Sequence, residues 1–147
     1  MKLPPTLINE LMKMNIDEAD ITEIILSTFN VNEALKPKIY SELSKITLER
    51  SCEFLKQGNY DEAIDKLCKS VELIVRSIAL SKGIKEAVES EANGRWTPTI
   101  TEKVAEKIGL KQYLTIVYSF YEKQPKKEEL EKSIETIKRI IINNNDN

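Results

Sequence analysis

Residues 59–83 read NYDEAIDKLCKSVELIVRSIALSKG and carry the clearest structural signal in the chain. Between Ala63 and Ala79 apolar residues recur every three or four positions, which is the spacing of one face of an α-helix. Asn59 offers a side-chain oxygen as N-cap, Glu62 stands at the capping-box position, and Gly83 is a natural end. The pattern predicts a long helix whose apolar face is buried.

The segment before it predicts a second long helix, from about Pro37 to Lys56. Gly58 ends this helix, because glycine tolerates the left-handed backbone that often follows a helix C-terminus. The link between the two helices is so short that they must form an antiparallel hairpin. The sequence therefore predicts a helical bundle built on this hairpin.

The rest of the chain also favours helices. Thr97 as N-cap and Pro98 at the first position begin a helix that stops at Gly109, and a dense apolar helix with several tyrosines ends before Pro125. A last amphipathic helix is expected from about Lys127 to Ile142. No element is assigned to residues 84–92, where the pattern is weak. We expect a single all-α domain over residues 37–142, an N-terminal helical extension over 1–36 and a disordered tail over 143–147.

Composition excludes several classes of function. The 147 residues include 22 Lys+Arg, 24 Asp+Glu and no histidine. Without histidine there is no Ser-His-Asp triad, no Cys-His pair and no His-ligated zinc. The net charge of −2 gives no electrostatic drive for nucleic-acid binding. The abundant lysine, glutamate and isoleucine are typical of thermophile proteins.

The expected cellular location is inferred from the cysteines and from the lack of long apolar runs in the sequence. Cys52 and Cys68 fall inside helical patterns and are expected to be buried or half-buried hydrophobes, and two thiols without an export signal indicate the cytoplasm. No stretch approaches the roughly 18 to 20 apolar residues of a membrane span. We expect no cofactor and no metal site; Glu49, Glu53 and Glu72 remain a remote metal alternative.

The loop Gly94-Arg95-Trp96 is the candidate ligand-binding site, with Arg95 and Trp96 as its binding residues. Arginine offers a planar fork for carboxylate or phosphate, and tryptophan offers a stacking face for a base. A structural interpretation is favoured over this one: Trp96 plugs the end of the bundle and Arg95 pairs with a nearby glutamate. Arg50 and Arg76 are expected to form partly buried bridges with Glu53 or Glu72.

Four motifs along the chain resemble the archaeal PaREP family: L-P at 3–4, E-R-x-x-E-F-L-x-x-G at 49–58, A-x-x-K-L-x-K-S-x-E at 63–72, and G-R-W-T at 94–97. The resemblance implies a relative of the HEPN domain, a helical bundle that is commonly dimeric and in its active members a metal-independent ribonuclease. Such enzymes carry an Arg followed a few residues later by His. Arg95 occupies the comparable loop, but Ile100, Thr101 or Glu102 stands where the histidine is expected.

These observations favour a non-catalytic interaction module over an enzyme. We expect a homodimer whose interface is made of amphipathic helix faces, because the N-terminal helices carry too many isoleucines to remain unpartnered. The alternative is a nucleotide- or RNA-binding protein that uses Arg95 and Trp96. The resemblance also implies a protein partner of the nucleotidyltransferase type.

Overall fold

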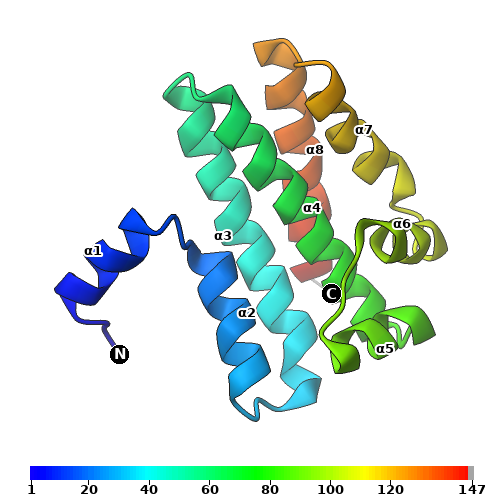
Figure 1. Cartoon of the computed structure of the whole chain (residues 1–147). Helices are drawn as coiled ribbons and strands as arrows, with labels where there is room; N and C mark the ends of the chain where they lie inside the picture. The colour runs from blue at the N-terminus through cyan, green and yellow to red at the C-terminus, as the bar shows by residue number, and fades with distance from the viewer. Residues whose placement is uncertain (146–147) are drawn as a thin grey trace. The chain divides into compact units, whose positions relative to one another are not determined.

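The computed structural model describes residues 1–145, and every α-helix and 3₁₀ turn within them lies in one of two compact units (Figure 1). The first unit is Met1–Val31 and the second begins at Asn32. The all-α prediction is confirmed, since no strand occurs in the described residues. The boundary falls after Val31 rather than after Lys36, because the 3₁₀ turn η1 (Glu33–Leu35) leads directly into the first long helix.

The first unit consists of helices α1 (Pro5–Lys13) and α2 (Glu18–Thr28). Asp17 caps α2: its side chain accepts from the backbone N–H of Asp20, at 3.0 Å, and the Asp20 carboxylate accepts from the N–H of Asp17 in return. This capping box fixes the start of α2 by purely local contacts.

The second unit is built on the predicted hairpin of α3 (Lys36–Lys56) and α4 (Tyr60–Ser81), which lie side by side in Figure 1. Gly58 has φ +75°, a left-handed conformation that a residue with a Cβ adopts only with strain. The side chain of Asn59 then caps α4 by accepting from the N–H of Glu62. The short link predicted from the sequence is therefore confirmed.

Small hydroxyl side chains line the seam between α3 and α4. Ser44 and Ser70 each donate to the other's backbone carbonyl, at 2.7 and 2.9 Å, and Ser51 donates to the carbonyl of Ala63 at 2.6 Å. Small residues let two helix backbones approach closely, and each buried hydroxyl has an acceptor. The seam is thus tight and polar at its centre.

Four further helices pack on the hairpin: α5 (Lys85–Asn93), α6 (Pro98–Lys107), α7 (Lys111–Glu122) and α8 (Lys127–Asn145). α8 lies along α3 and α4, α7 packs on α4, and α6 contacts α4, α5 and α7. Large, completely buried side chains form one core, which includes Leu67, Ile74, Leu114, Leu130, Ile137 and Ile141. The apolar face of α4 is buried, as its spacing predicted.

Two expectations about local structure were wrong. Residues 85–93 form α5, although only Ala87 and Ser90 are buried there and small residues give a weak pattern. The tail predicted to be disordered is helical up to Asn145, because Asn144 and Asn145 both hydrogen-bond to the Ser41 hydroxyl on α3. Residues 146 and 147 lie outside the described part. Within residues 1–145, no helix has both the length and the apolarity that a membrane crossing requires.

Candidate functional site

The Arg95–Trp96 loop connects α5 to α6 and is held by backbone geometry at both ends. Gly94 closes α5 in the left-handed conformation, with φ +65°, and the N–H of Arg95 donates to the carbonyl of Ser90 at 3.0 Å. Thr97 then caps α6 by accepting from the N–H of Ile100, and Pro98 occupies the first turn. The start of α6 was correctly predicted from these residues.

Trp96 is fixed to the bundle through the carboxylate of Glu91. The indole Nε1–H donates to Oε2 of Glu91 at 3.0 Å, and the hydroxyl of Tyr40 donates to Oε1 at 2.7 Å. The ammonium of Lys36 lies 3.5 Å from the same Oε1. Because the Glu91 side chain is only 9% exposed, this buried carboxylate joins α3, α5 and the loop in one network.

Lys36 is the charge that balances this network. Its side chain is 10% exposed and its ammonium lies 2.9 Å from Glu33 as well as near Glu91. Burial lowers the pKa of Lys36, but the hydrogen bond to Glu33 and the two carboxylate charges outweigh burial and raise the pKa above its usual value. Lys36 therefore stays charged at neutral pH, and its positive charge balances the buried carboxylate of Glu91.

Arg76 on α4 lies against the two aromatic rings of the network. Its guanidinium carbon is 5.1 Å from the ring centroid of Trp96 and 5.8 Å from that of Tyr40, and the residue is only 6% exposed. Cation–π contact with both rings stabilises the buried charge. The bridge predicted for Arg50 does form with Glu53, at 2.9 Å, but on the surface, with both side chains about half exposed.

The two predicted binding residues have different surroundings. Trp96 is half-buried among Glu91 and Arg76, whereas the Arg95 side chain is exposed. Within residues 1–145 the Arg95 guanidinium makes no hydrogen bond or ion pair, so the glutamate expected to pair with it is not in place. The surroundings of Trp96 match the structural interpretation, while those of Arg95 do not.

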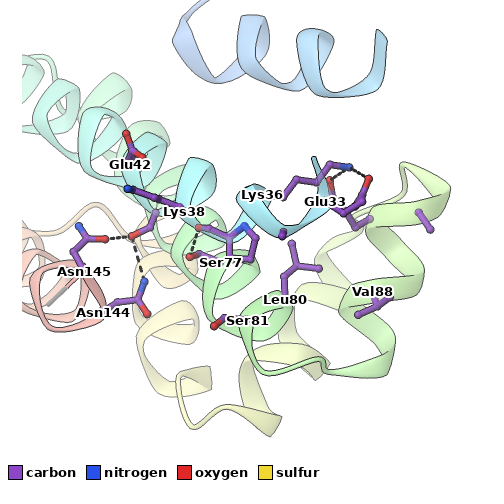
Figure 2. Close-up of a pocket in the computed structure, with 15 residues that line it drawn as sticks. Glu33, Lys36, Lys38, Glu42, Ser77, Leu80, Ser81, Val88, Asn144 and Asn145 are labelled. Atoms are coloured by element: carbon purple, nitrogen blue, oxygen red, sulfur yellow. Dashed lines mark hydrogen bonds and ion pairs between the residues drawn. The ribbon is translucent and has the colours of Figure 1, made fainter. Parts of the chain in front are cut away.

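A cleft of about 900 Å³, lined by both polar and apolar residues, lies beside the Glu91 network (Figure 2). One end of the view holds Glu33, Lys36 and Val88. The other end holds Lys38 and Glu42 of α3 and the two asparagines of α8. Between them lie Ser77, Leu80 and Ser81 of α4. The Ser77 hydroxyl already donates to the carbonyl of Pro37 at 2.6 Å. Sequence analysis missed this cleft, because its residues come from five separate elements: η1, α3, α4, α5 and α8.

A second, mainly apolar groove of about 370 Å³ lies between α7 and α8. Tyr113, Ile116 and Phe120 line it from α7, and Thr136 and Ile137 line it from α8. Ile116 is about half exposed, so it adds an apolar ridge to the rim of the groove. Only part of this tyrosine-rich helix belongs to the core: Leu114, Val117 and Phe120 are buried, while Tyr121 is exposed.

Neither metal binding nor thiol chemistry is supported by the geometry. In the described chain no three Asp, Glu or Cys residues are grouped as metal ligands would be, so the remote alternative at Glu49, Glu53 and Glu72 gains no support. Cys52 and Cys68 are both free thiols, half-buried and buried as expected. Burial raises the pKa of the Cys68 thiol to about 12, which keeps it protonated and unreactive.

The first unit differs from the bundle in its exposed apolar surface. α1 buries none of its residues, and α2 buries only Ala19. Nine large apolar side chains are exposed in this short unit: Met1, Leu3, Leu7, Ile8, Met12, Met14, Ile24, Ile25 and Phe29. This exposed apolar surface makes the first unit a candidate interaction site.

Comparison with known proteins gives one match. The model of the archaeal PaREP1/PaREP8 family matches residues 39–141, which include α4, the Arg95–Trp96 loop and most of α8. No curated protein and no solved structure matches the chain.

Proposed function

The chain belongs to the archaeal PaREP1/PaREP8 family, and from this premise we propose that it is a non-catalytic helical module that associates with a second copy of itself through α1 and α2. The observation that carries the proposal is the apolar surface of Met1–Val31. Burying apolar area stabilises an interface by roughly 25 cal/mol per Å². A homodimer is the commonest way for a chain to cover such a surface.

The experiment compares two isoleucines with nearly equal exposure, one in each unit. Ile8 on α1 is 40% exposed and Ile46 on α3 is 41% exposed. We expect Ile8→Asp to convert the dimer into a monomer in sedimentation equilibrium, whereas Ile46→Asp leaves the dimer intact. Unsubstituted protein that remains monomeric at every concentration, or equal effects of the two substitutions, would contradict the proposal.

We extend the proposal to the type of fold, which we interpret as a HEPN-like bundle. A long antiparallel helix pair covered by shorter helices supports this, as does the position of Arg95 just before α6. The chain contains no histidine, so the general acid–base group of HEPN ribonucleases is missing. We accordingly propose that the protein does not cleave RNA, and a nuclease assay on purified protein with an RNase inhibitor tests this.

The location and source proposed for the module rest on its cysteines and its composition. Two free thiols are compatible with a reducing cytoplasm, and the lysine- and glutamate-rich composition is compatible with a thermophilic source. A protein partner of the nucleotidyltransferase type remains a proposal drawn from the HEPN resemblance. Co-expression of the chain with such a candidate partner, followed by size-exclusion chromatography, tests it.

A second candidate function is nucleotide or RNA binding at Arg95 and Trp96. The observation in its favour is the exposed Arg95 guanidinium, which is available for a phosphate next to the N-terminus of α6. Against it, one face of Trp96 already contacts Arg76. Titration of the tryptophan fluorescence with nucleotides and short RNAs separates the candidates. The interaction module predicts no change, whereas a binding site predicts quenching that Arg95→Ala abolishes and Arg95→Lys partly retains.

A further inference from the structure

We propose that the cleft beside the Glu91 network binds a free amino acid with a large apolar side chain. The cleft holds about 900 Å³, which is within the range of small-molecule sites in proteins. This inference is independent of the proposed homodimer, because every residue that lines the cleft lies in the second unit. It also concerns a different place from the Arg95–Trp96 loop, since neither of those residues lines the cleft.

The inner wall of the cleft is held by contacts within the protein. The Lys36 ammonium lies 2.9 Å from Glu33 and 3.5 Å from Glu91. The Ser77 hydroxyl donates to the carbonyl of Pro37 at 2.6 Å. These groups already have partners, so they shape the cleft. A wall that is ordered before a ligand arrives loses little conformational freedom when the ligand binds.

Two oppositely charged side chains at one end of the cleft have no partner. Lys38 and Glu42 are both exposed, both line the cleft, and stand one helical turn apart on α3 (Figure 2). In the part of the chain that the structure describes, neither forms a hydrogen bond or an ion pair. Lysine before glutamate is the weaker order for a pair at this spacing, so pairing between the two competes little with a ligand.

The charges on the wall select the class of ligand. Three carboxylates and two ammonium groups line the cleft, and the paired Lys36 is not available to a ligand. A phosphate or another simple anion would meet repulsion from the Glu42 carboxylate, and a simple organic cation would meet repulsion from the Lys38 ammonium. A zwitterion avoids both, because its carboxylate pairs with Lys38 while its ammonium pairs with Glu42.

Apolar residues beyond this charged pair select the side chain of the ligand. Leu80 of α4 is half-buried and lies between the two ends of the cleft in Figure 2, and Val88 of α5 is about half exposed at the far end. When the charged groups of an amino acid are held at Lys38 and Glu42, its side chain extends along the cleft toward Leu80. Burial of apolar surface then favours a leucine-sized side chain over the hydrogen atom of glycine.

Titration of the isotope-labelled full-length chain with L-leucine, followed by two-dimensional NMR, tests the proposal. We expect the backbone amide signals of Lys38, Glu42 and Leu80 to shift together and to saturate with one dissociation constant. Three further probes each remove one feature of the ligand: isocaproate lacks the ammonium, isopentylamine lacks the carboxylate, and glycine lacks the side chain. Each should bind about tenfold more weakly than L-leucine, or less tightly still.

The same helix provides a matched control for the charged pair. Lys38→Gln and Glu42→Gln should each raise the dissociation constant for L-leucine by about tenfold. Lys45 and Glu49 are the same residue types at the same spacing on α3 and are also exposed, but neither lines the cleft. Lys45→Gln and Glu49→Gln should leave the dissociation constant unchanged. Because all four side chains are exposed, every variant should fold, and circular dichroism checks this.

A further variant fills the cleft without changing its charges. Ser81 is exposed and lies in the middle of the cleft, so Ser81→Trp should abolish the binding of L-leucine while the bundle keeps its fold. Binding that survives Ser81→Trp, or equal losses in the Lys38 and Lys45 variants, would place the ligand elsewhere and overturn the proposal.

Two other results would also overturn it. One is the absence of any shift with L-leucine at all concentrations. The other is binding of isocaproate or isopentylamine as tight as that of L-leucine, which would show that the cleft does not recognise a zwitterion. Neither result bears on the homodimer, which sedimentation equilibrium tests separately.

Discussion

Helices α1 and α4 are both amphipathic, yet they use their apolar faces in opposite ways. α4 buries twelve residues, including Leu67 and Ile74 of the core, whereas α1 buries none. The same periodicity therefore stabilises the fold in one helix and leaves an exposed apolar face in the other. Periodicity alone predicts that a face needs covering, but what covers it depends on the rest of the chain.

The largest expected effect is on the free energy of unfolding, when one leucine is truncated in each of the two helices. The two variants test the contrast directly. Leu67→Ala removes a completely buried side chain from the core and should lower the free energy of unfolding by about 3 to 4 kcal/mol. Leu7→Ala, on the exposed face of α1, should change it by less than about 0.5 kcal/mol in the monomer. Urea unfolding followed by circular dichroism, at a concentration where the chain is monomeric, measures both. Similar losses for the two variants would show that α1 is part of the core.

The second largest effect concerns the Glu91 network. This network joins α3, α5 and the Arg95–Trp96 loop through hydrogen bonds and an ion pair rather than through an apolar helix face. Glu91→Ala leaves Tyr40, Trp96 and Lys36 without their shared carboxylate. We expect a loss of about 3 kcal/mol in unfolding free energy and a shift of the Trp96 emission toward longer wavelength.

The matched control for this change lies on the same helix. Glu89 is more than half exposed and pairs with Lys85 at 3.9 Å, so Glu89→Ala should cost less than about 0.5 kcal/mol and leave the emission unchanged. Equal losses for Glu89→Ala and Glu91→Ala would mean that the network contributes nothing beyond the helix itself.

A smaller effect is expected from pH, through Cys68 on the buried face of α4. Burial raises the pKa of its thiol from 9.0 to about 12, so the unfolded chain loses this proton at lower pH than the folded chain. The contribution is complete below pH 9 and is lost progressively as pH rises toward 12, by up to about 1.4 kcal/mol per pH unit. Unfolding free energies measured from pH 8 to 11 should fall more steeply in the wild type than in Cys68→Ala. Parallel pH profiles would contradict this assignment.

The sequence predicted most of the fold because most of its signals are local. Asn59 and Thr97 cap helices through contacts three residues away, and the apolar spacing of α4 needs only its own residues. α5 was missed since its buried positions are the small residues Ala87 and Ser90. These give little apolar contrast, so a periodicity argument has nothing to detect.

Contacts between distant segments account for what the sequence did not predict. The hydroxyl of Tyr40 reaches Glu91 across 51 positions, and Ser41 reaches Asn145 across 104. No periodicity links such pairs, so neither the Glu91 network nor the helical end of α8 could be inferred. The Arg95–Trp96 loop was located correctly from Gly94 and Pro98, but the sequence could not separate an anchored Trp96 from an exposed Arg95.

The smallest predicted effect comes from substituting Gly94, which joins α5 to the Arg95–Trp96 loop. Its substitutions test the backbone conformation alone, without a change in side-chain contacts. Gly94 has φ +65°, and a Cβ added there meets no atom within 4 Å. Any cost of Gly94→Ala is therefore conformational, and about 1 kcal/mol is expected in unfolding free energy. Gly94→Asn should cost less, since asparagine enters the left-handed region more readily than alanine. Thermal unfolding of the two variants at equal concentration measures the order. If alanine costs no more than asparagine, the left-handed turn does not define the loop, and the Glu91 network alone holds Trp96 in place.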